Sequence, residues 1–184
     1  ACRKVLEDIH PDVRWIADTE RRELPVETLR ELEGLIDIYL PDMKYSDPKL
    51  AAKLSAAPDY VETAKAAIAE MYRQVGGAGI EDEIMQRGMI VRHLMLPGAL
   101  DNTLGVLDWF SEAFPKGDVL FSLMSQYVPM GKAKNMPPYD RRITEDEYDA
   151  ALSYLELLGI ENGFTQDFSA ATEDYIPDFS FEGL

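Results

Sequence analysis

Polar side chains that could do chemistry follow or interrupt three apolar runs of this sequence. Asp42 and Lys44 come soon after the run at residues 35–40, and Arg92 interrupts the run at residues 89–96. Gln126 and Tyr127 follow the run at residues 119–124. If each run is a strand of a parallel sheet, these side chains lie at its carboxyl edge, where α/β proteins bind their ligands.

Arg92 needs a partner, because an unpaired charge inside an apolar strand costs several kcal/mol. Two interpretations stay open. Arg92 forms a structural ion pair with Asp42 in the sheet interior, or it holds a ligand carboxylate or phosphate with Asp42 and Lys44 beside it. Asp42 and Lys44 point the same way if the extended conformation continues past the strand. His93 could be a general base or a ligand, but it points away from Arg92, so we expect a packed or helix-facing histidine.

Two further segments have weaker signals. The glycine-rich stretch at residues 76–79 follows an expected helix and lacks the Lys-Ser/Thr of a phosphate loop, so we interpret it as a flexible connector. Lys132 and Lys134 lie in an irregular stretch at residues 125–142. They could contact an anionic substrate, but a solvated loop face is the simpler interpretation.

Cysteine and charge exclude several classes of function. The sole cysteine, Cys2, allows no intramolecular disulfide and no thiolate cage, and with two histidines a closed zinc site is not expected. We therefore predict neither metal ligands nor a cluster within this chain. The 34 acidic and 18 basic residues give a net charge of −16, which disfavours nucleic acid and anionic membranes as partners. We find no signal peptide or membrane-spanning run and expect a cytoplasmic protein.

Apolar spacing predicts alternating strands and helices. Strands are expected at residues 13–17, 35–40, 89–96, 119–124 and 164–166. Helices are expected at residues 5–9 and 60–75, and one that Pro25 opens and Gly34 closes. Three more are expected to start at Asp47, at an N-cap at Asp101, and at a capping box formed by Thr144 and Glu147. Strands that are apolar on both faces, each followed by an amphipathic helix, indicate an α/β fold with a parallel sheet. It is either an open doubly wound sheet or part of a barrel. Residues 1–166 are expected to form it, with residues 167–184 as a tail.

Three of these segments, in order, are similar to consecutive strands of one enzyme family. Residues 37–45 read DIYLPDMKY, residues 90–98 read IVRHLMLPG, and residues 122–130 read SLMSQYVPM. The chain resembles the radical S-adenosylmethionine (SAM) iron–sulfur proteins related to pyruvate formate-lyase activating enzymes. The resemblance implies a partial (β/α) barrel, incomplete at its N-terminal side.

The resemblance also implies roles for the five polar residues. Asp42, Lys44, Arg92, Gln126 and Tyr127 match positions that border the SAM site of that family. The family's Cys-x-x-x-Cys-x-x-Cys loop is absent from these 184 residues, so SAM and a [4Fe–4S] cluster are expected of the complete protein and the cluster is not expected in this chain.

The function implied by the resemblance is that of the C-terminal part of a radical SAM protein. The complete protein would cleave SAM reductively to a 5′-deoxyadenosyl radical and act on a protein or small-molecule substrate. The alternative is a non-catalytic α/β binding or scaffold domain that lacks the cluster. A third, weaker possibility is a cluster-free enzyme that uses Asp42 and Lys44 as an acid–base pair.

Overall fold

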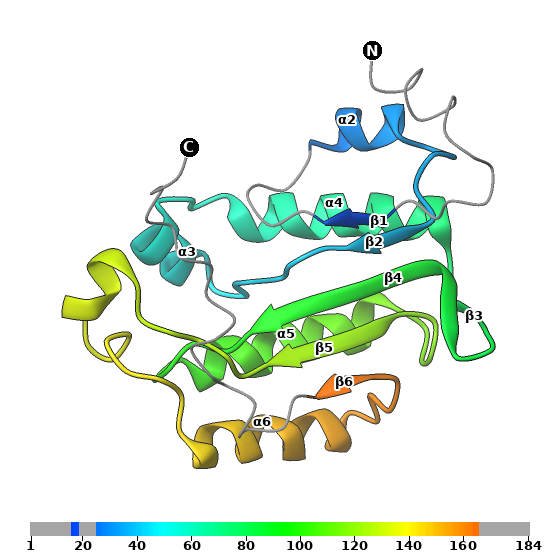
Figure 1. The fold of residues 1–184 in the computed structure, drawn as a ribbon. Helices are drawn as coiled ribbons and strands as arrows, with labels where there is room; N and C mark the ends of the chain where they lie inside the picture. Colours follow the sequence, from blue (N-terminus) through cyan, green and yellow to red (C-terminus); the bar gives the residue numbers. More distant parts are fainter. Residues whose placement is uncertain (1–15, 19–24, 166–184) are drawn as a thin grey trace, which may run out of the picture.

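The computed structural model describes residues 16–18 and 25–165 as one layer of strands and one of helices (Figure 1). The chain is an α/β protein in which strands and helices alternate. The order is β1 (Ile16–Asp18), α2 (Val26–Glu31), β2 (Ile38–Leu40), α3 (Pro48–Ser55), α4 (Tyr60–Val75), β3 (Gly79–Glu81), β4 (Ile84–Leu94), α5 (Leu100–Ala113), β5 (Leu120–Met124), the 3₁₀ helix η1 (Gly131–Asn135), α6 (Glu145–Leu157) and β6 (Gly163–Thr165).

The strand order decides between the two architectures that the sequence left open. Five strands pair in parallel in the order β1-β2-β4-β5-β6, which is the order of the chain. A doubly wound sheet reverses its order at a switch point, whereas a (β/α) barrel does not. No pairing within the described residues joins β6 back to β1, so the sheet is open. The fold is therefore a partial (β/α) barrel, as predicted.

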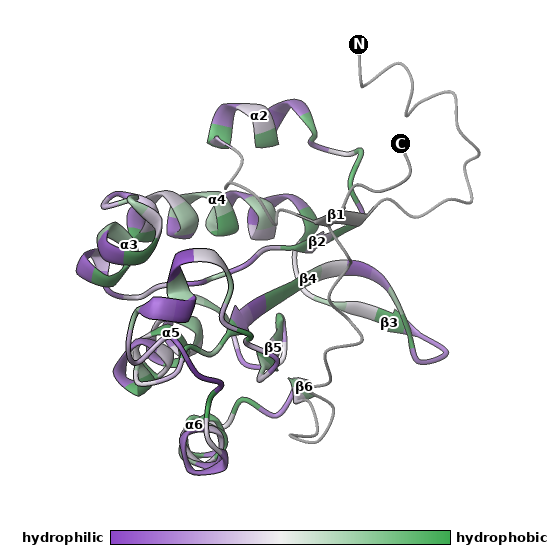
Figure 2. Ribbon diagram, turned by 60° about the vertical axis from the view of Figure 1, so that its left-hand side comes forward, coloured by the Kyte–Doolittle hydropathy of each residue, from purple (hydrophilic) through white to green (hydrophobic). Residues whose placement is uncertain are grey.

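One face of the sheet is packed against helices α4, α5 and α6 (Figure 2). Along β4, Val91 and His93 are buried on this face, whereas the alternating Arg92 and Leu94 are only partly buried on the other. The core residues of the helices recur at the three-to-four spacing of a helix face. They include Ala64, Ile68 and Met71 of α4, Val106, Leu107 and Phe110 of α5, and Tyr148, Ala151 and Leu155 of α6.

Two helix starts follow their predicted chemistry and a third does not. The Asp47 carboxylate accepts a hydrogen bond from the Lys49 amide (2.8 Å), and Thr144 and Glu147 form the predicted capping box. The prediction of Asp101 as an N-cap is wrong. Helix α5 begins at Leu100, Ala99 occupies the N-cap position without a side-chain cap, and Asp101 lies in the first turn. A carboxylate there still interacts favourably with the helix dipole.

The stretch at residues 76–79, predicted as a connector, leads into a hairpin that was not predicted: residues 76–78 lie outside any helix or strand, and Gly79 begins β3. Strand β3 pairs antiparallel with the first part of β4, through a tight turn in which Asp82 and Glu83 have positive φ angles of 49° and 64°. The first residues of β4 belong to this hairpin, so β4 begins before the parallel sheet does. It bends into the main sheet at Gly88, whose φ of +127° disfavours any other residue.

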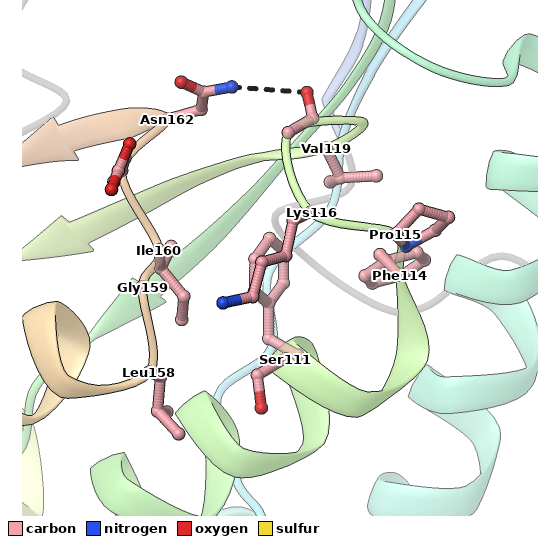
Figure 3. A pocket seen from close by; sticks show the side chains of 12 residues that line it. Ser111, Phe114, Pro115, Lys116, Val119, Leu158, Gly159, Ile160 and Asn162 are labelled. Atoms are coloured by element: carbon pink, nitrogen blue, oxygen red, sulfur yellow. Dashed lines mark hydrogen bonds between the residues drawn. The ribbon is translucent and has the colours of Figure 1, made fainter.

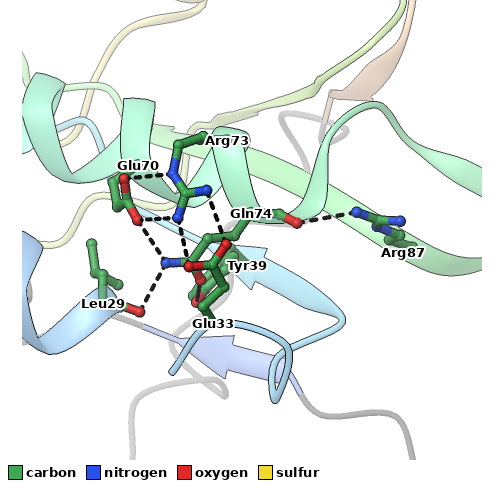
Figure 4. Close-up of polar contacts among 7 residues, drawn as sticks. All are labelled: Leu29, Glu33, Tyr39, Glu70, Arg73, Gln74 and Arg87. Carbon is green, nitrogen blue, oxygen red and sulfur yellow. Dashed lines mark hydrogen bonds and ion pairs between the residues drawn. The ribbon is translucent and has the colours of Figure 1, made fainter. Parts of the chain in front are cut away.

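A polar network ties α2 to α4 at the amino end of the sheet (Figure 4). Gln74 of α4 accepts a hydrogen bond from the Tyr39 hydroxyl (2.7 Å) and donates one to the Leu29 carbonyl (2.8 Å). The buried Glu70 accepts hydrogen bonds from Arg73 and Gln74, and these lower its pKa to about 2. Burial, with the negative charge of Glu70 nearby, raises the pKa of Tyr39 to about 12. This network lies at the end of the sheet opposite the predicted ligand site.

Several predictions fall on residues outside the described ranges. They are the helix at residues 5–9, most of the strand at 13–17, and the tail at 167–184. The domain boundary at residue 166 stays a prediction. Within the described ranges, no helix is long and apolar enough to cross a membrane.

Candidate functional site

The candidate site begins with an ion pair at the carboxyl edge of the sheet. Beyond β2 the chain stays extended, and Asp42 pairs with Arg92 of β4 as an isolated parallel bridge. The Arg92 amide donates to the Pro41 carbonyl and the Met43 amide to the Arg92 carbonyl, both at 2.8 Å. The two side chains then meet on the inner face of the sheet, the face not packed on α4 and α5, where Arg92 Nε donates to Asp42 Oδ1 at 2.8 Å. Strand pairing therefore sets this contact.

Lys44 completes the charged cluster. Its Nζ lies 3.6 Å from Asp42 Oδ2, so Asp42 has a cation on each carboxylate oxygen. The Asp42 and Arg92 side chains are 13% and 18% exposed, and Lys44 is 42% exposed. Partial burial strengthens these Coulomb interactions relative to an open surface. The predicted common direction of Asp42 and Lys44 is confirmed by this contact.

Side chains of two helices hydrogen-bond the backbone of the segment that carries Asp42 and Lys44 and hold it in place. The Tyr60 hydroxyl at the start of α4 donates to the Asp42 carbonyl and accepts from the Lys44 amide, each at 2.9 Å. Asn102 of α5 donates to the Lys44 carbonyl (3.0 Å) and accepts from the Ser46 amide (2.9 Å). The segment is thus fixed before any ligand arrives, as a precise binding site requires.

His93 anchors the same segment from the helix side of the sheet. Its ring is fully buried, with Nδ1 2.7 Å from the Met43 carbonyl and Nε2 3.0 Å from the Thr103 hydroxyl. A carbonyl only accepts, so Nδ1 carries the proton and Nε2 accepts from Thr103. Burial lowers the pKa of His93 to about 4. The predicted packed, helix-facing histidine is confirmed.

All five predicted site residues line one cavity of about 500 Å³. Its polar wall is Asp42, Lys44, Arg92, Gln126 and Tyr127, and its apolar wall is Tyr45, Leu94, Leu96 and Met124. This volume lies within the range of about 300–1,000 Å³ that small-molecule sites occupy. The two interpretations of Arg92 are compatible, because the ion pair with Asp42 is itself part of the cavity wall.

The end of β5 contributes unpaired polar atoms to this region. Ser125 Oγ and Gln126 Oε1 are buried without a hydrogen-bond partner among the described residues. A buried polar atom without a partner costs about 1–3 kcal/mol. If the Gln126 amide rotated toward a ligand, a donor group of that ligand could bond Gln126 Oε1 and so remove part of the cost of burying it. The neighbouring Tyr127 donates its hydroxyl to the Tyr139 carbonyl (2.8 Å), and burial raises its pKa.

Sequence reasoning missed Tyr60 and Asn102, which position the site without lining the cavity. One signal was present: Asn102 and Thr103 are polar residues adjoining the apolar face of α5 formed by Val106, Leu107 and Phe110. Polar side chains in such a place need partners: Asn102 binds the Ser46 amide in the segment after β2, and Thr103 binds the His93 ring of β4.

A second crevice lies at the opposite, amino end of the strands (Figure 3). It has a volume of about 250 Å³ and lies between the ends of α5 and α6, with Lys116, Val119 and Ile160 among its lining residues. At its rim, the Asn162 side-chain amide donates a hydrogen bond to the Gly117 carbonyl (3.4 Å). In barrel folds this end serves stability rather than ligand binding.

Nothing in the described part of the chain gathers three or more His, Cys, Asp or Glu side chains in a way that could hold a metal ion. The whole sequence has a single cysteine, Cys2, which lies outside the described residues. Three thiolates for an iron–sulfur cluster therefore cannot come from this chain.

Comparisons with known proteins agree with the fold. No protein-family model matches the chain. In sequence, it is 31% identical over 139 residues to an uncharacterised protein of Methanocaldococcus jannaschii. The match covers 75% of this chain and 37% of that protein, so the chain spans little more than a third of its relative.

In structure, the chain is similar to a crystal structure of a domain of pyruvate-formate lyase-activating enzyme from Bacteroides vulgatus. The TM-score is 0.58, with 13% sequence identity, and the match covers 84% of this chain and 82% of the other. At that identity the similarity shows the fold alone: an open, parallel (β/α) barrel segment.

Proposed function

We propose that this chain is the SAM-binding part of a radical SAM protein related to pyruvate formate-lyase activating enzymes. The observation that carries the proposal is the meeting of Asp42, Lys44, Arg92, Gln126 and Tyr127 in one cavity at the carboxyl edge of a parallel sheet. The structural similarity to a domain of such an activating enzyme adds support at the level of the fold.

The charges of the cavity suit a ligand that carries both signs. SAM has a carboxylate, an ammonium group and a sulfonium centre. Arg92 and Lys44 would balance its carboxylate, and Asp42 would balance its positive centres. Leu94, Leu96 and Met124 offer apolar contacts to the remainder of the ligand and exclude water from it. These residues would bind and orient SAM, and no side chain is assigned a bond-making role.

The iron–sulfur cluster that the family implies does not fit this chain, because Cys2 is its single thiol. We propose that its ligands belong to another part of the complete protein. SAM is the source of the 5′-deoxyadenosyl radical in that family, and this chain would hold SAM for that cleavage. We propose that residues 1–166 form the partial radical SAM barrel, with residues 167–184 as a C-terminal tail.

Titration calorimetry with S-adenosylhomocysteine, a stable analogue of SAM, tests the proposal. We expect binding to the 184-residue chain and a loss of about tenfold or more in affinity for Arg92→Gln, the scale of one charged hydrogen bond. Arg87→Gln is the matched control, since Arg87 lies on the same strand, is exposed, and bonds the Gln74 carbonyl away from the cavity.

A double variant separates loss of binding from loss of folding. Arg92→Gln alone leaves the Asp42 carboxylate with a weaker partner, whereas Asp42→Asn with Arg92→Gln removes both charges. If the double variant unfolds with a wild-type midpoint in urea and still binds the analogue as tightly as wild type, the proposal fails. Complete absence of binding by the folded wild-type chain would favour the alternative of a non-catalytic scaffold.

A further inference from the structure

A second groove adjoins the proposed SAM site. It has a volume of about 650 Å³ and shares Tyr45, Leu96 and Tyr127 with the first cavity. Its outer wall comes from the end of α3 and from η1. The lining residues there are Lys53, Leu54, Ser55, Ala56, Met130, Lys132, Ala133, Met136 and Tyr139. The two cavities therefore lie on either side of one shared wall.

The charge of the groove is opposite to that of the protein. Apart from tyrosines, its ionisable lining residues are Lys53 and Lys132, and no Asp or Glu lines it. The chain as a whole has 34 acidic and 18 basic residues. Both lysines are exposed, and no ion pair with a carboxylate is found for either among the described residues. Two cations facing one concavity favour an anionic group.

The rest of the groove is apolar and held in place. Leu54, Met130 and Met136 offer apolar surface, and Met130 is 53% exposed. Lys53 Nζ lies 5.1 Å from the centre of the Tyr139 ring, and the Tyr139 carbonyl accepts from Tyr127. Tyr45 is hydrogen-bonded to Ser55 at 2.8 Å. Contacts across the groove thus fix α3, Tyr139 in the segment after η1, and the shared wall to one another.

We propose that this groove binds the substrate, a small organic molecule with an anionic head group and an apolar body. Lys53 and Lys132 would hold a carboxylate or phosphate head, and the body would lie on Leu54, Met130 and Met136 toward the shared wall. The assignment of the ligand as substrate rests on the proposed function, which puts SAM on the other side of that wall. The anion-binding groove itself rests only on the residues named here.

A matched pair of fluorescent probes tests the head-group preference. 8-Anilinonaphthalene-1-sulfonate carries an anionic sulfonate, and N-phenyl-1-naphthylamine has the same aromatic body without it. We expect Lys53→Gln and Lys132→Gln each to weaken binding of the sulfonate probe about threefold, and the double variant about tenfold. The neutral probe should bind all variants equally. Lys134→Gln, a neighbouring exposed lysine of η1 that does not line the groove, is the control.

Displacement of the sulfonate probe by phenyl phosphate or by benzoate then distinguishes a phosphate head from a carboxylate head. An unchanged affinity of the double lysine variant for the sulfonate probe would overturn the inference. So would a loss that Arg92→Gln causes and the lysine variants do not.

The same proteins separate this inference from the proposed function. The double lysine variant should bind S-adenosylhomocysteine as wild type does. If the lysines control the probe but no variant binds the analogue, the proposed function fails and the anion site stands. If the analogue binds and the lysines have no effect on the probe, the proposed function stands and the anion-binding inference fails.

Discussion

Acidification from pH 7.5 to pH 5 should destabilise this fold through His93. The ring is fully buried, donates from Nδ1 to the Met43 carbonyl and accepts at Nε2 from Thr103. Protonation would add a buried charge and turn the acceptor Nε2 into a second donor. The folded chain therefore resists protonation, which is the reason for the lowered pKa of about 4.

The sign and size of the effect follow from linkage. A histidine whose pKa is 6.5 in the unfolded chain and about 4 in the folded chain stabilises the fold fully above pH 6.5. That stabilisation is lost as the pH falls from 6.5 toward 4. One pKa unit is worth about 1.4 kcal/mol, so about 2 kcal/mol is lost by pH 5.

Urea unfolding of wild type and His93→Gln at pH 7.5, 6.5, 5.5 and 5.0 measures this loss. Glu70 and Glu147 have pKa values lowered to about 2, and their contributions fade mainly below pH 5 and equally in both proteins. The wild type should be more stable than His93→Gln at pH 7.5, and the difference in unfolding free energy should shrink by about 2 kcal/mol at pH 5. A difference that stays constant with pH would refute this account of His93.

Two other substitutions test the segments around the site. Tyr60→Phe removes the hydroxyl that bridges the Asp42 carbonyl and the Lys44 amide, so it should lower stability by about 1 kcal/mol and weaken S-adenosylhomocysteine binding about threefold in calorimetry. Unchanged affinity would mean that the bridge does not position Lys44. Glu147→Gln weakens a carboxylate bound by the Gly98 amide, the Thr144 amide and Arg141, and should cost about 1–2 kcal/mol in urea unfolding. Glu145→Gln in the same helical turn is exposed and should change stability by about 0.5 kcal/mol or less, and equal effects of the two would contradict this assignment.

The regular elements were predictable where apolar residues keep a clear period. The runs at residues 35–40 and 119–124 contain the strands β2 and β5, the run at 89–96 covers the second part of β4, and the stripe from Tyr60 to Val75 is helix α4. The β3–β4 hairpin was missed because its turn uses Asp82 and Glu83 with positive φ, where Gly or Asn is usual. Its glycine-rich entry gave no alternating pattern to interpret.

The candidate site was predictable in part. Asp42, Lys44 and Arg92 are recognisable as polar residues at the ends or inside of apolar strands, where something must pair them. Their supports are not, because Tyr60 and Asn102 reach the segment after β2 from 18 and 58 residues away in the chain. Such contacts depend on how α4 and α5 pack on the sheet, and no local pattern records that.

The adjacent groove shows the same limit. Lys132 was interpreted from sequence as part of a solvated loop face, since the stretch at residues 125–142 is irregular and rich in proline, glycine and lysine. The fold brings it and Lys53, 79 positions earlier, to one concavity beside Tyr127. The proposed anion binding follows from this proximity across the fold and not from the local sequence.

A crystal structure of the chain soaked with S-adenosylhomocysteine tests the central claim most directly. The account predicts electron density for the ligand in the cavity between Arg92 and Tyr127, with its carboxylate within hydrogen-bond distance of Arg92 or Lys44. Density for the ligand in the crevice beside Lys116 and Ile160, at the other end of the strands, would contradict it.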